Sequence, residues 1–202
     1  MLELKKELER IKDSFSRISE IVYQTPVLSS TYINKALKAD VTFKAECLQE
    51  TGSFKFRGAS SAISALSEEE KSKGVVAFSS GNHAQGIAYA SRELGTSAKI
   101  VMPSDAPKIK IRKTQEYGAE VIFYDRDEDN REEIGLSIAK KEGRKLIKPF
   151  DDLNVIYGQG TAALEVMDEV DTKFDMSVVC CSGGGLAAGT GIVLKNSLRD
   201  CQ

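Results

Sequence analysis

The sequence predicts an α/β fold in which a parallel sheet is covered by helices. From residue 75 onward, short apolar runs alternate with longer stretches whose apolar residues recur at helical intervals. Glycine follows three of these helical stretches, at positions 95, 118 and 143, as expected where a helix ends with a left-handed residue. Strands that alternate with helices form βαβ units, which make the strands parallel and bury the sheet on both faces.

Each element follows from the local pattern. Charged and apolar residues alternate at helical spacing over residues 2–21, which predicts a helix, and Thr25-Pro26 favours an extended segment over 23–30. Apolar runs predict strands over residues 41–46, 75–79, 98–102, 120–124, 145–148 and 176–181. Helices are predicted over residues 82–94, 107–117, 130–142, 157–169 and 186–198, with Pro107 in a first helical turn.

The chain contains no Gly/Ser linker and no repeat beyond the strand-helix alternation. Any domain boundary must therefore lie where the chain crosses between packed lobes. We expect a small lobe over residues 51–142 and a large lobe built from residues 1–50 and 143–202. A ligand should lie between them, at the carboxyl ends of the strands.

The composition is that of an ordinary globular protein. Of the 202 residues, 41% are hydrophobic and 29% are charged, and the formal net charge is −2. With no basic tract, nucleic acid and acidic membranes are not expected partners. No apolar run approaches the roughly 20 residues that span a bilayer, and the N-terminus lacks the apolar core of a signal peptide. The expected location is the cytoplasm.

The four cysteines are Cys47, Cys180, Cys181 and Cys201, and His83 is the only histidine. No CxxC spacing appears, so a Cys/His zinc site is not expected and no metal ligand is assigned. We expect the cysteines to be reduced and mostly buried.

The first of three loops that could carry chemistry is ETGSFKFRG, residues 50–58, which contains Lys55. Small residues precede a lysine flanked by two aromatics, and a helix follows. Loss of hydration disfavours the ammonium, so the amine becomes available as nucleophile and base. Arg57 would act in the same direction if it lies close. The alternative is a solvated lysine at a helix start, since lysine is rarely fully buried.

The second loop is SSGNHAQG, residues 79–86, where a predicted strand ends and a helix begins. Exposed backbone N–H groups at a helix start favour an anion such as a carboxylate, and Ser80 and Asn82 add side-chain donors. The alternative is simple helix capping. Capping explains one such residue, but explains less well why two serines, an asparagine and the only histidine share five positions.

The third loop comprises Ser182, Gly183, Gly184, Gly185 and Leu186, between a predicted strand and a predicted helix. Glycines let the backbone approach a ligand closely, and a helix N-terminus attracts phosphate. A flexible turn is one alternative. A dinucleotide-binding loop is another, with Ala188 as a permitted third position, but such a loop usually follows the first strand of its sheet and this one follows the last.

Four segments in this order carry a resemblance: TGSFKFRGA, SSGNHAQGIA, PFDDLNVIYGQGT and CSGGGLAAG. Together they resemble fold type II (β-family) pyridoxal-phosphate (PLP) enzymes, most closely the threonine dehydratases and serine racemases. The similarity runs from about Thr25 to the last residue. It implies a two-lobed α/β fold with PLP as the cofactor.

The resemblance also implies roles for individual residues. Lys55 forms the Schiff base with PLP, Asn82 bonds the ring hydroxyl and Phe54 packs near the ring, while Ser182, Gly183, Gly184, Gly185 and Leu186 bind the phosphate. The substrate carboxylate is expected at Ser53, Ser80, Asn82 and His83. Ser80 matches a serine that serves the substrate face opposite the lysine in racemases. Arg131 matches an arginine near the substrate, and an exposed helix charge is the alternative for this residue.

The chain departs from the family pattern in places. It has Gln24-Thr25-Pro26 where many relatives have His-Thr-Pro, and Ser182 where glycine is common. Family members also continue well beyond the glycine loop, and that part supplies further strands, the contact to the pyridine nitrogen and, in racemase-like members, a metal site. We therefore expect an incomplete large lobe and, for these 202 residues alone, little or no activity.

The implied function is that of a dehydratase, or ammonia-lyase. It would convert L-threonine, L-serine or a similar β-hydroxy amino acid such as 3-hydroxyaspartate to a 2-keto acid and ammonia. If Ser80 instead returns a proton from the other face, the activity is that of a serine racemase. The full-length protein is expected to form a homodimer. The alternatives are a non-catalytic chain that keeps the PLP fold and a dinucleotide-binding protein.

Overall fold

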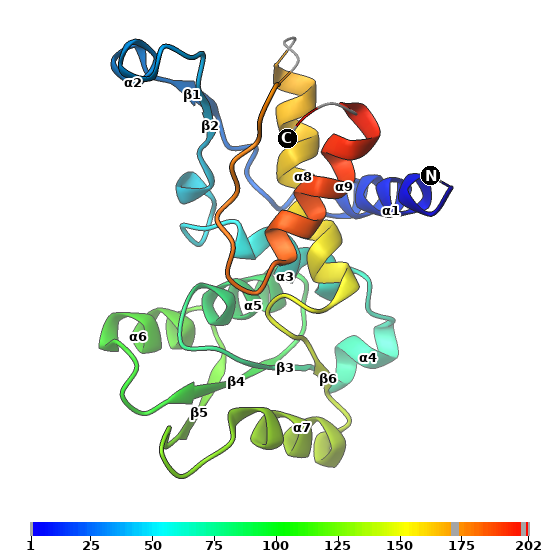
Figure 1. Cartoon of the computed structure of the whole chain (residues 1–202). Helices are drawn as coiled ribbons and strands as arrows, with labels where there is room; N and C mark the ends of the chain where they lie inside the picture. The colour runs from blue at the N-terminus through cyan, green and yellow to red at the C-terminus, as the bar shows by residue number, and fades with distance from the viewer. Residues whose placement is uncertain (1, 171–173, 199–200, 202) are drawn as a thin grey trace.

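The computed structural model of the chain describes residues 2–170, 174–198 and 201. Its main sheet has four strands in the order β5-β4-β3-β6, and every neighbouring pair is parallel. These strands are β3 (Val75–Phe78), β4 (Ala98–Pro103), β5 (Glu120–Tyr124) and β6 (Lys145–Leu146). They lie side by side in the lower half of Figure 1. The predicted α/β class with a parallel sheet is confirmed.

The helices predicted over residues 2–21, 82–94, 107–117, 130–142, 157–169 and 186–198 all occur with shifted ends, whereas the helices over residues 31–37 and 68–73 were not predicted. The helices of the structure are α1 (Leu2–Ile18), α2 (Thr31–Leu37), α3 (Lys55–Ser64), α4 (Glu68–Lys73), α5 (Asn82–Glu93), α6 (Lys108–Glu116), α7 (Arg131–Glu142), α8 (Leu153–Glu169) and α9 (Gly185–Ser197). Gly95, Gly118 and Gly143 have positive φ, which confirms their expected place at helix ends. Pro107 precedes the first turn of α6 instead of lying within it.

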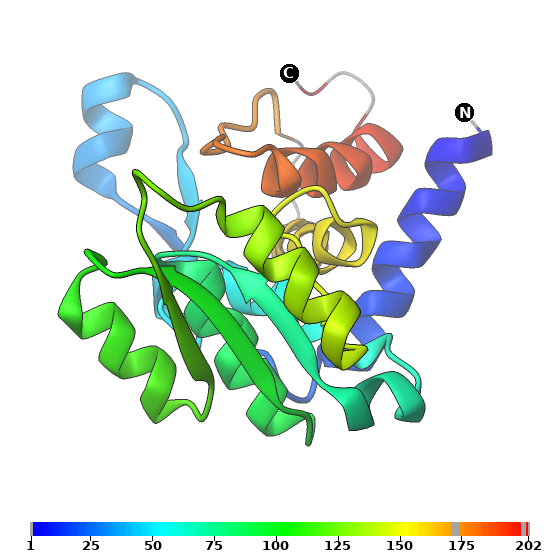
Figure 2. The ribbon, with the colours of Figure 1, turned by 90° about the horizontal axis from the view of Figure 1, so that it is seen from below.

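Alternate side chains of β3 point to opposite faces of the sheet, and each face is covered by its own helices. Val75 and Ala77 are buried in the larger apolar core, together with residues of α3 and α5. Val76 and Phe78 are buried in a second core, where Ile134 of α7 packs against them. Figure 2 shows α7 on one face of the sheet and α5 with α6 on the other. β3 is therefore buried on both faces, as its continuous apolar run predicts.

A stack of helices continues from the sheet through α3, α8 and α9. Glycine permits its closest contacts: a Cβ placed on Gly158 of α8 would lie 2.5 Å from the backbone oxygen of Arg57 and 2.6 Å from Cα of Gly58, both in α3. A Cβ on Gly189 of α9 would lie 2.6 Å from the backbone nitrogen of Gly160. The helix backbones therefore touch, and α3 is held between α5 and α8.

A small antiparallel pair, β1 (Val27–Ser29) and β2 (Thr42–Lys44), carries α2 at its tip and projects from the helical stack (Figure 1). A short 3-10 helix (Glu46–Leu48) then leads back toward α3. Within the described part of the chain, no helix is long and apolar enough to cross a bilayer.

The prediction of a strand over residues 176–181 is wrong. These residues carry no strand in the structure, and Met176 is 61% and Val178 90% exposed. A strand forms when its backbone N–H and C=O groups pair with a neighbouring strand. Among the described residues none pairs with this segment, which runs beside α8 in Figure 1.

The expectation that the cysteines are mostly buried is also wrong. Cys47, Cys180 and Cys181 are exposed and form no disulfide, whereas Cys201 is buried. Cys180 and Cys181 are exposed for the same reason as Val178, because no strand among the described residues pairs with their segment.

The division into lobes over residues 51–142 and the flanking segments stays a prediction. β6 begins at Lys145, beyond the expected end of the small lobe, and pairs with β3 through Val75↔Lys145 and Val76↔Leu146. The four-stranded sheet thus includes two residues assigned to the other lobe.

Candidate functional site

Lys55 is the first residue of α3 and is half-buried. Its Nζ donates a hydrogen bond of 2.6 Å to the backbone oxygen of Pro149 and lies 5.4 Å from the centroid of the Phe54 ring. Burial lowers the pKa of the Lys55 ammonium below its ordinary value. This is the direction required of a lysine that acts as nucleophile and base.

The position of Lys55 is fixed from two sides. Before it, Gly52 turns the chain with φ +74°, and its N–H bonds the backbone oxygen of Gln49 at 2.6 Å. Beside it, a Cβ placed on Gly86 of α5 would lie 3.1 Å from the backbone oxygen of Lys55. The glycine at position 86 thus brings the first turns of α3 and α5 into backbone contact.

Arg57, two residues further on, is fully buried and binds two glutamates. Its guanidinium bonds Glu46 at 2.8 and 2.9 Å and Glu165 at 2.6 and 2.8 Å. Burial alone would lower the pKa of Arg57, but the hydrogen bonds with the two carboxylates outweigh it and raise that pKa. Arg57 is therefore compensated by the glutamates, and the lowered pKa of Lys55 is caused by burial.

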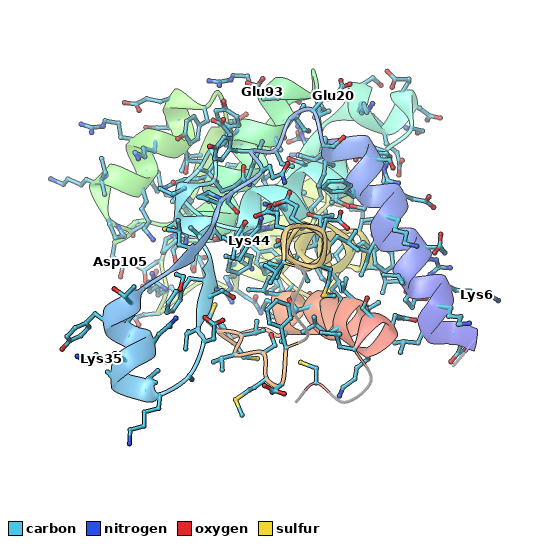
Figure 3. The ribbon with its side chains drawn as sticks, turned by 90° about the horizontal axis from the view of Figure 1, so that it is seen from above. Lys6, Glu20, Lys35, Lys44, Glu93 and Asp105 are labelled. Atoms are coloured by element: carbon cyan, nitrogen blue, oxygen red, sulfur yellow. The ribbon has the colours of Figure 1, made fainter. Side chains whose placement is uncertain are left out.

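One of these glutamates, Glu165, also binds a second cation. Lys44 of β2 lies 2.8 Å from Glu165 and 2.9 Å from Glu169, both on α8. Figure 3 shows Lys44 beside α8, which is viewed nearly along its axis. This buried network ties β2, α3 and α8 together directly behind Lys55.

The Ser79–Asn82 turn joins β3 to α5. Gly81 is the N-cap of α5, and no side chain makes a capping hydrogen bond there. The Ser79 hydroxyl instead accepts a bond from the N–H of Gly81 at 3.2 Å. Side-chain capping by Ser80 or Asn82 is thus not what the structure contains, and the first-turn N–H groups of α5 stay available for an anion.

His83, in the first turn of α5, is only 2% exposed. Burial, and then the charge of Lys55, lower its pKa to about 4, so the imidazole is neutral at pH 7. Its Nε2 lies 3.3 Å from the backbone oxygen of Ile147, an acceptor, which makes Nε2 the protonated nitrogen. Nδ1 then carries a lone pair and has no partner among the described residues.

The glycine loop leads into α9. Gly184 is the N-cap, with φ +89°, and α9 begins at Gly185 without a side-chain cap. A Cβ on Gly184 would meet no atom within 4 Å, whereas one on Gly183 would lie 2.1 Å from the ring of Phe150. Glycine is needed at position 184 because of its positive φ, and at position 183 because a side chain would collide with Phe150. The space over Gly184 is open.

Pro149 and Phe150 connect Lys55 to the glycine loop. The oxygen of Pro149 receives the Lys55 hydrogen bond, and the next residue packs against Gly183 and Gly185. His83 is coupled to Lys55 electrostatically and bonds the backbone at Ile147, two residues before Pro149. The segment after β6 thus brings the three predicted loops to one side of the molecule.

The remaining predicted residues lie around this centre. Ser53 is buried with its hydroxyl unpartnered in the described structure, Ser80 is half-buried and Asn82 is exposed. Arg131 is exposed, with its guanidinium 5.6 Å from the ring centroid of Phe78, the residue before Ser79. Arg131 therefore lies beside the turn, at the carboxyl end of β3.

A cavity of about 330 Å³ adjoins the site without containing Lys55. Phe54 and Leu186 line it, together with residues of β2, α8, α9 and the segment 174–180. The cavity is mostly apolar and lies where the predicted strand is unpaired. We therefore assign the chemistry to the Lys55 side and not to this cavity.

Sequence reasoning did not identify two contributors to the site. The carbonyl of Pro149 carried no signal, because any backbone oxygen can accept a hydrogen bond. Lys110 had none either, although its Nζ lies 3.1 Å from an ideal Cβ on Gly81. In chemical terms the site combines a desolvated lysine with two helix N-termini that attract anions.

Comparison with known proteins identifies the family. Residues 18–202 match the family described as pyridoxal-phosphate dependent enzyme, so the chain belongs to that family. It is 44% identical over 192 residues to serine racemase of Schizosaccharomyces pombe and 46% identical over 192 residues to L-threo-3-hydroxyaspartate ammonia-lyase of Saccharomyces cerevisiae. Each alignment covers 95% of this chain and 59% of the relative.

Solved structures of the same family have the same fold. The crystal structure of serine racemase from Dictyostelium discoideum superposes with a TM-score of 0.92 at 42% identity, over 96% of this chain and 63% of that one. The processed threonine deaminase isoform 2 from Solanum lycopersicum gives 0.93 at 36% identity, over 99% of this chain and 57% of that one. The predicted family, fold class and PLP cofactor are confirmed, and the chain spans about three fifths of the relatives' length.

The residues of the site fit this cofactor. An open, positive-φ glycine at the start of a thirteen-residue helix suits a phosphate, and a lysine amine with a lowered pKa suits Schiff-base chemistry. The buried hydroxyls of Thr51 and Ser53 have no hydrogen-bond partner in the described part of the chain, so they are available to bind a ligand.

Proposed function

We propose that the protein carrying this chain is a PLP-dependent ammonia-lyase. Its substrate is a β-hydroxy amino acid, namely L-threonine, L-serine or L-threo-3-hydroxyaspartate, and its products are a 2-keto acid and ammonia. The observation that carries the proposal is the half-buried Lys55 amine, which is held by the Pro149 oxygen among the three loops. Relatives named as ammonia-lyases support the assignment.

The cofactor would be held by the chain at three places. Lys55 would bind it covalently, the backbone of Ser182, Gly183, Gly184, Gly185 and Leu186 would bind its phosphate at the start of α9, and Asn82 with Phe54 would contact its ring. When bound, PLP withdraws electron density from the substrate's Cα. The protein supplies position and proton transfer.

The substrate's amino group would displace Lys55 from the cofactor, and the freed Lys55 amine would remove the proton from the substrate's Cα. The lowered pKa of Lys55 favours the neutral amine, which has a lone pair for that proton. The β-hydroxyl would then leave as water, with the proton that Lys55 received, and the resulting unsaturated amine would be hydrolysed to the keto acid and ammonia. The Pro149 oxygen holds Nζ at 2.6 Å and so limits where the amine can reach.

The substrate's carboxylate is bound at the start of α5. The first-turn N–H groups of this helix, that of His83 among them, have no side-chain cap, and the hydroxyls of Ser53 and Ser80 and the amide of Asn82 add to them. The low pKa of about 4 keeps His83 neutral, so it adds no positive charge beside Lys55. The direction of the hydrogen-bond donors, more than the charge of His83, therefore determines how the carboxylate is bound.

Racemization is the second candidate outcome, and Ser80 is the residue that favours it. This serine lies at the carboxyl end of β3, whereas Lys55 begins α3, so the two can serve different faces of the substrate. A proton returned by Ser80 gives the opposite enantiomer. Several relatives are named serine racemase, which supports testing both products.

The test is to express the protein from its complete reading frame and to assay keto acid and D-amino acid in parallel. We expect keto acid from at least one of the three substrates, and Lys55→Ala should abolish it. Lys113→Ala, an exposed lysine on α6, is the matched control and should retain activity. Absence of both products with every substrate would favour the non-catalytic alternative.

Expression of residues 1–202 alone tests the prediction that this stretch has little or no activity. A cytoplasmic homodimer also stays a prediction, for which sedimentation and cell fractionation are the direct measurements.

A further inference from the structure

Lys110 lies over the turn where we place the substrate carboxylate. It is the third residue of α6, and its Nζ is 3.1 Å, and its Cδ 4.0 Å, from an ideal Cβ on Gly81. Gly81 is the N-cap of α5. The half-buried lysine therefore extends from one helix start to the next, across the carboxyl ends of β3 and β4.

This placement is electrostatically unfavourable without an anion. The N-terminus of a helix carries partial positive charge, so an ammonium near it is repelled. Lys110 is close to two such ends, because it lies in the first turn of α6 and above the N-cap of α5. The first turn of α6 contains no acidic residue.

α7, the next helix along the chain, shows how a cation at a helix start is compensated. Arg131 also lies at the start of a helix, but Glu132 and Glu133 share the first turn of α7 and Asn130 caps it. α6 has neither feature: its N-cap is Pro107, which makes no side-chain capping bond, and its first turn contains no acidic residue.

Acidic groups near Lys110 in the sequence are already paired with other cations. Asp105 bonds Arg126 at 2.7 Å, and Glu116 lies 3.4 Å from Arg112. Over residues 2–170 and 174–198, no carboxylate comes within ion-pair distance of Lys110, whereas Lys44, Lys71 and Lys99 each have one. Lys110 is therefore open to an anion from outside the described chain.

We propose that Lys110 determines substrate specificity by binding the second carboxylate of a dicarboxylic β-hydroxy amino acid, the 3-hydroxyaspartate class. This inference rests on the proposed function. One carboxylate of such a substrate needs the first-turn N–H groups of α5, and the other lies a few bonds away, within reach of an ammonium placed over Gly81. L-Serine and L-threonine lack the second carboxylate and leave Lys110 without an anion.

Arg131 is the other cation beside the turn, but it lies at Phe78, on the face of the sheet that packs on α7. Lys110 and Arg131 thus flank the Ser79–Asn82 turn from different helices. Of the two, Lys110 is the one without acidic neighbours in its own helical turn, so we assign it the second carboxylate.

The test compares Lys110→Gln, Lys110→Arg and Lys108→Gln in the holoenzyme made from the complete reading frame. Lys108 is exposed in the same helical turn and serves as the matched control. We expect Lys110→Gln to lower kcat/KM for L-threo-3-hydroxyaspartate by about 10- to 100-fold, as for loss of one charge-assisted contact, and to change it less than about threefold for L-serine. Lys110→Arg should retain most of the hydroxyaspartate activity, and Lys108→Gln should change neither.

A binding measurement separates this inference from the proposed reaction. Succinate and butyrate cannot react because they lack the amino group, and calorimetry gives their affinities directly. Succinate should bind Lys110→Gln about tenfold or more weakly than the parent, with butyrate unchanged.

An equal loss for hydroxyaspartate and serine, or no loss for either, would overturn the role of Lys110. Absence of turnover with succinate binding still dependent on Lys110 would reject the proposed reaction and keep the dicarboxylate site.

Discussion

Replacing Arg57 with methionine should cost more stability than any surface change in this chain. The side chain is fully buried and holds both oxygens of Glu46 and both of Glu165. Methionine fills a similar volume but leaves two carboxylates without their shared cation. Glu165 keeps Lys44 at 2.8 Å and Glu46 keeps the hydroxyl of Thr25 at 2.6 Å, so neither is stripped completely.

The magnitude follows from what is left unpaired. Removing one partner of a buried ion pair costs about 3–5 kcal/mol, mainly because the other charge stays desolvated. In a domain of about 200 residues each kcal/mol shifts Tm by about 2–4 °C, so Tm should fall by about 6–20 °C. Arg126→Met is the control: its pair with Asp105 is exposed, and such pairs contribute about 0–1 kcal/mol.

Urea denaturation and thermal melting of the two variants test this reasoning. Neutralising a stranded carboxylate should restore part of the loss, so Arg57→Met with Glu165→Gln should be more stable than Arg57→Met alone. If Arg57→Met unfolds within about 1 kcal/mol of the parent, or if the second substitution destabilises it further, the network does not act as described.

Three other predictions concern the site. Lys55→Ala and Lys55→Arg should both lose turnover, because a guanidinium stays protonated, and borohydride reduction of the parent should label Lys55 and no other lysine. Gly184→Val should weaken PLP binding at least about tenfold in a folded protein, because φ is +89° there and the side chain would fill the open space, and unchanged affinity would contradict the phosphate assignment. His83 has a pKa of about 4 when folded and about 6.5 when unfolded, so stability should fall by about 3 kcal/mol as pH drops from 6.5 to 4, and His83→Gln should show a flatter pH profile between these values.

The sheet and its helices could be predicted because local pattern and tertiary role agree there. Val75–Phe78 is apolar throughout and is buried on both faces, and Gly95, Gly118 and Gly143 adopt the positive φ that their positions suggest. The apolar run over residues 176–181 has the same local character, but a strand also needs a neighbour to pair with. That requirement is non-local, so the local pattern could not show that the segment forms no strand in the structure.

The candidate site could be predicted as three loops but not as one arrangement. Lys55, His83 and the glycine loop each stand out by residue type, whereas their connection depends on a backbone oxygen at Pro149 and on the ring of Phe150. Neither contact is encoded in spacing along the chain. Lys110 is similar, because its significance comes only from the fold that places α6 next to the start of α5.

The site has helix N-termini in its buried interior and cationic side chains at its edge. Burial lowers the pKa of both Lys55 and His83 and leaves the His83 imidazole neutral, so the N-termini of α5 and α9 contribute to the attraction for anions in the interior. Two further cationic side chains, Lys110 and Arg131, reach the Ser79–Asn82 turn from α6 and α7. Salt screens exposed charges more than buried dipoles. Raising the ionic strength should therefore weaken succinate binding more than butyrate binding, and equal sensitivity of the two would place the second carboxylate away from the rim.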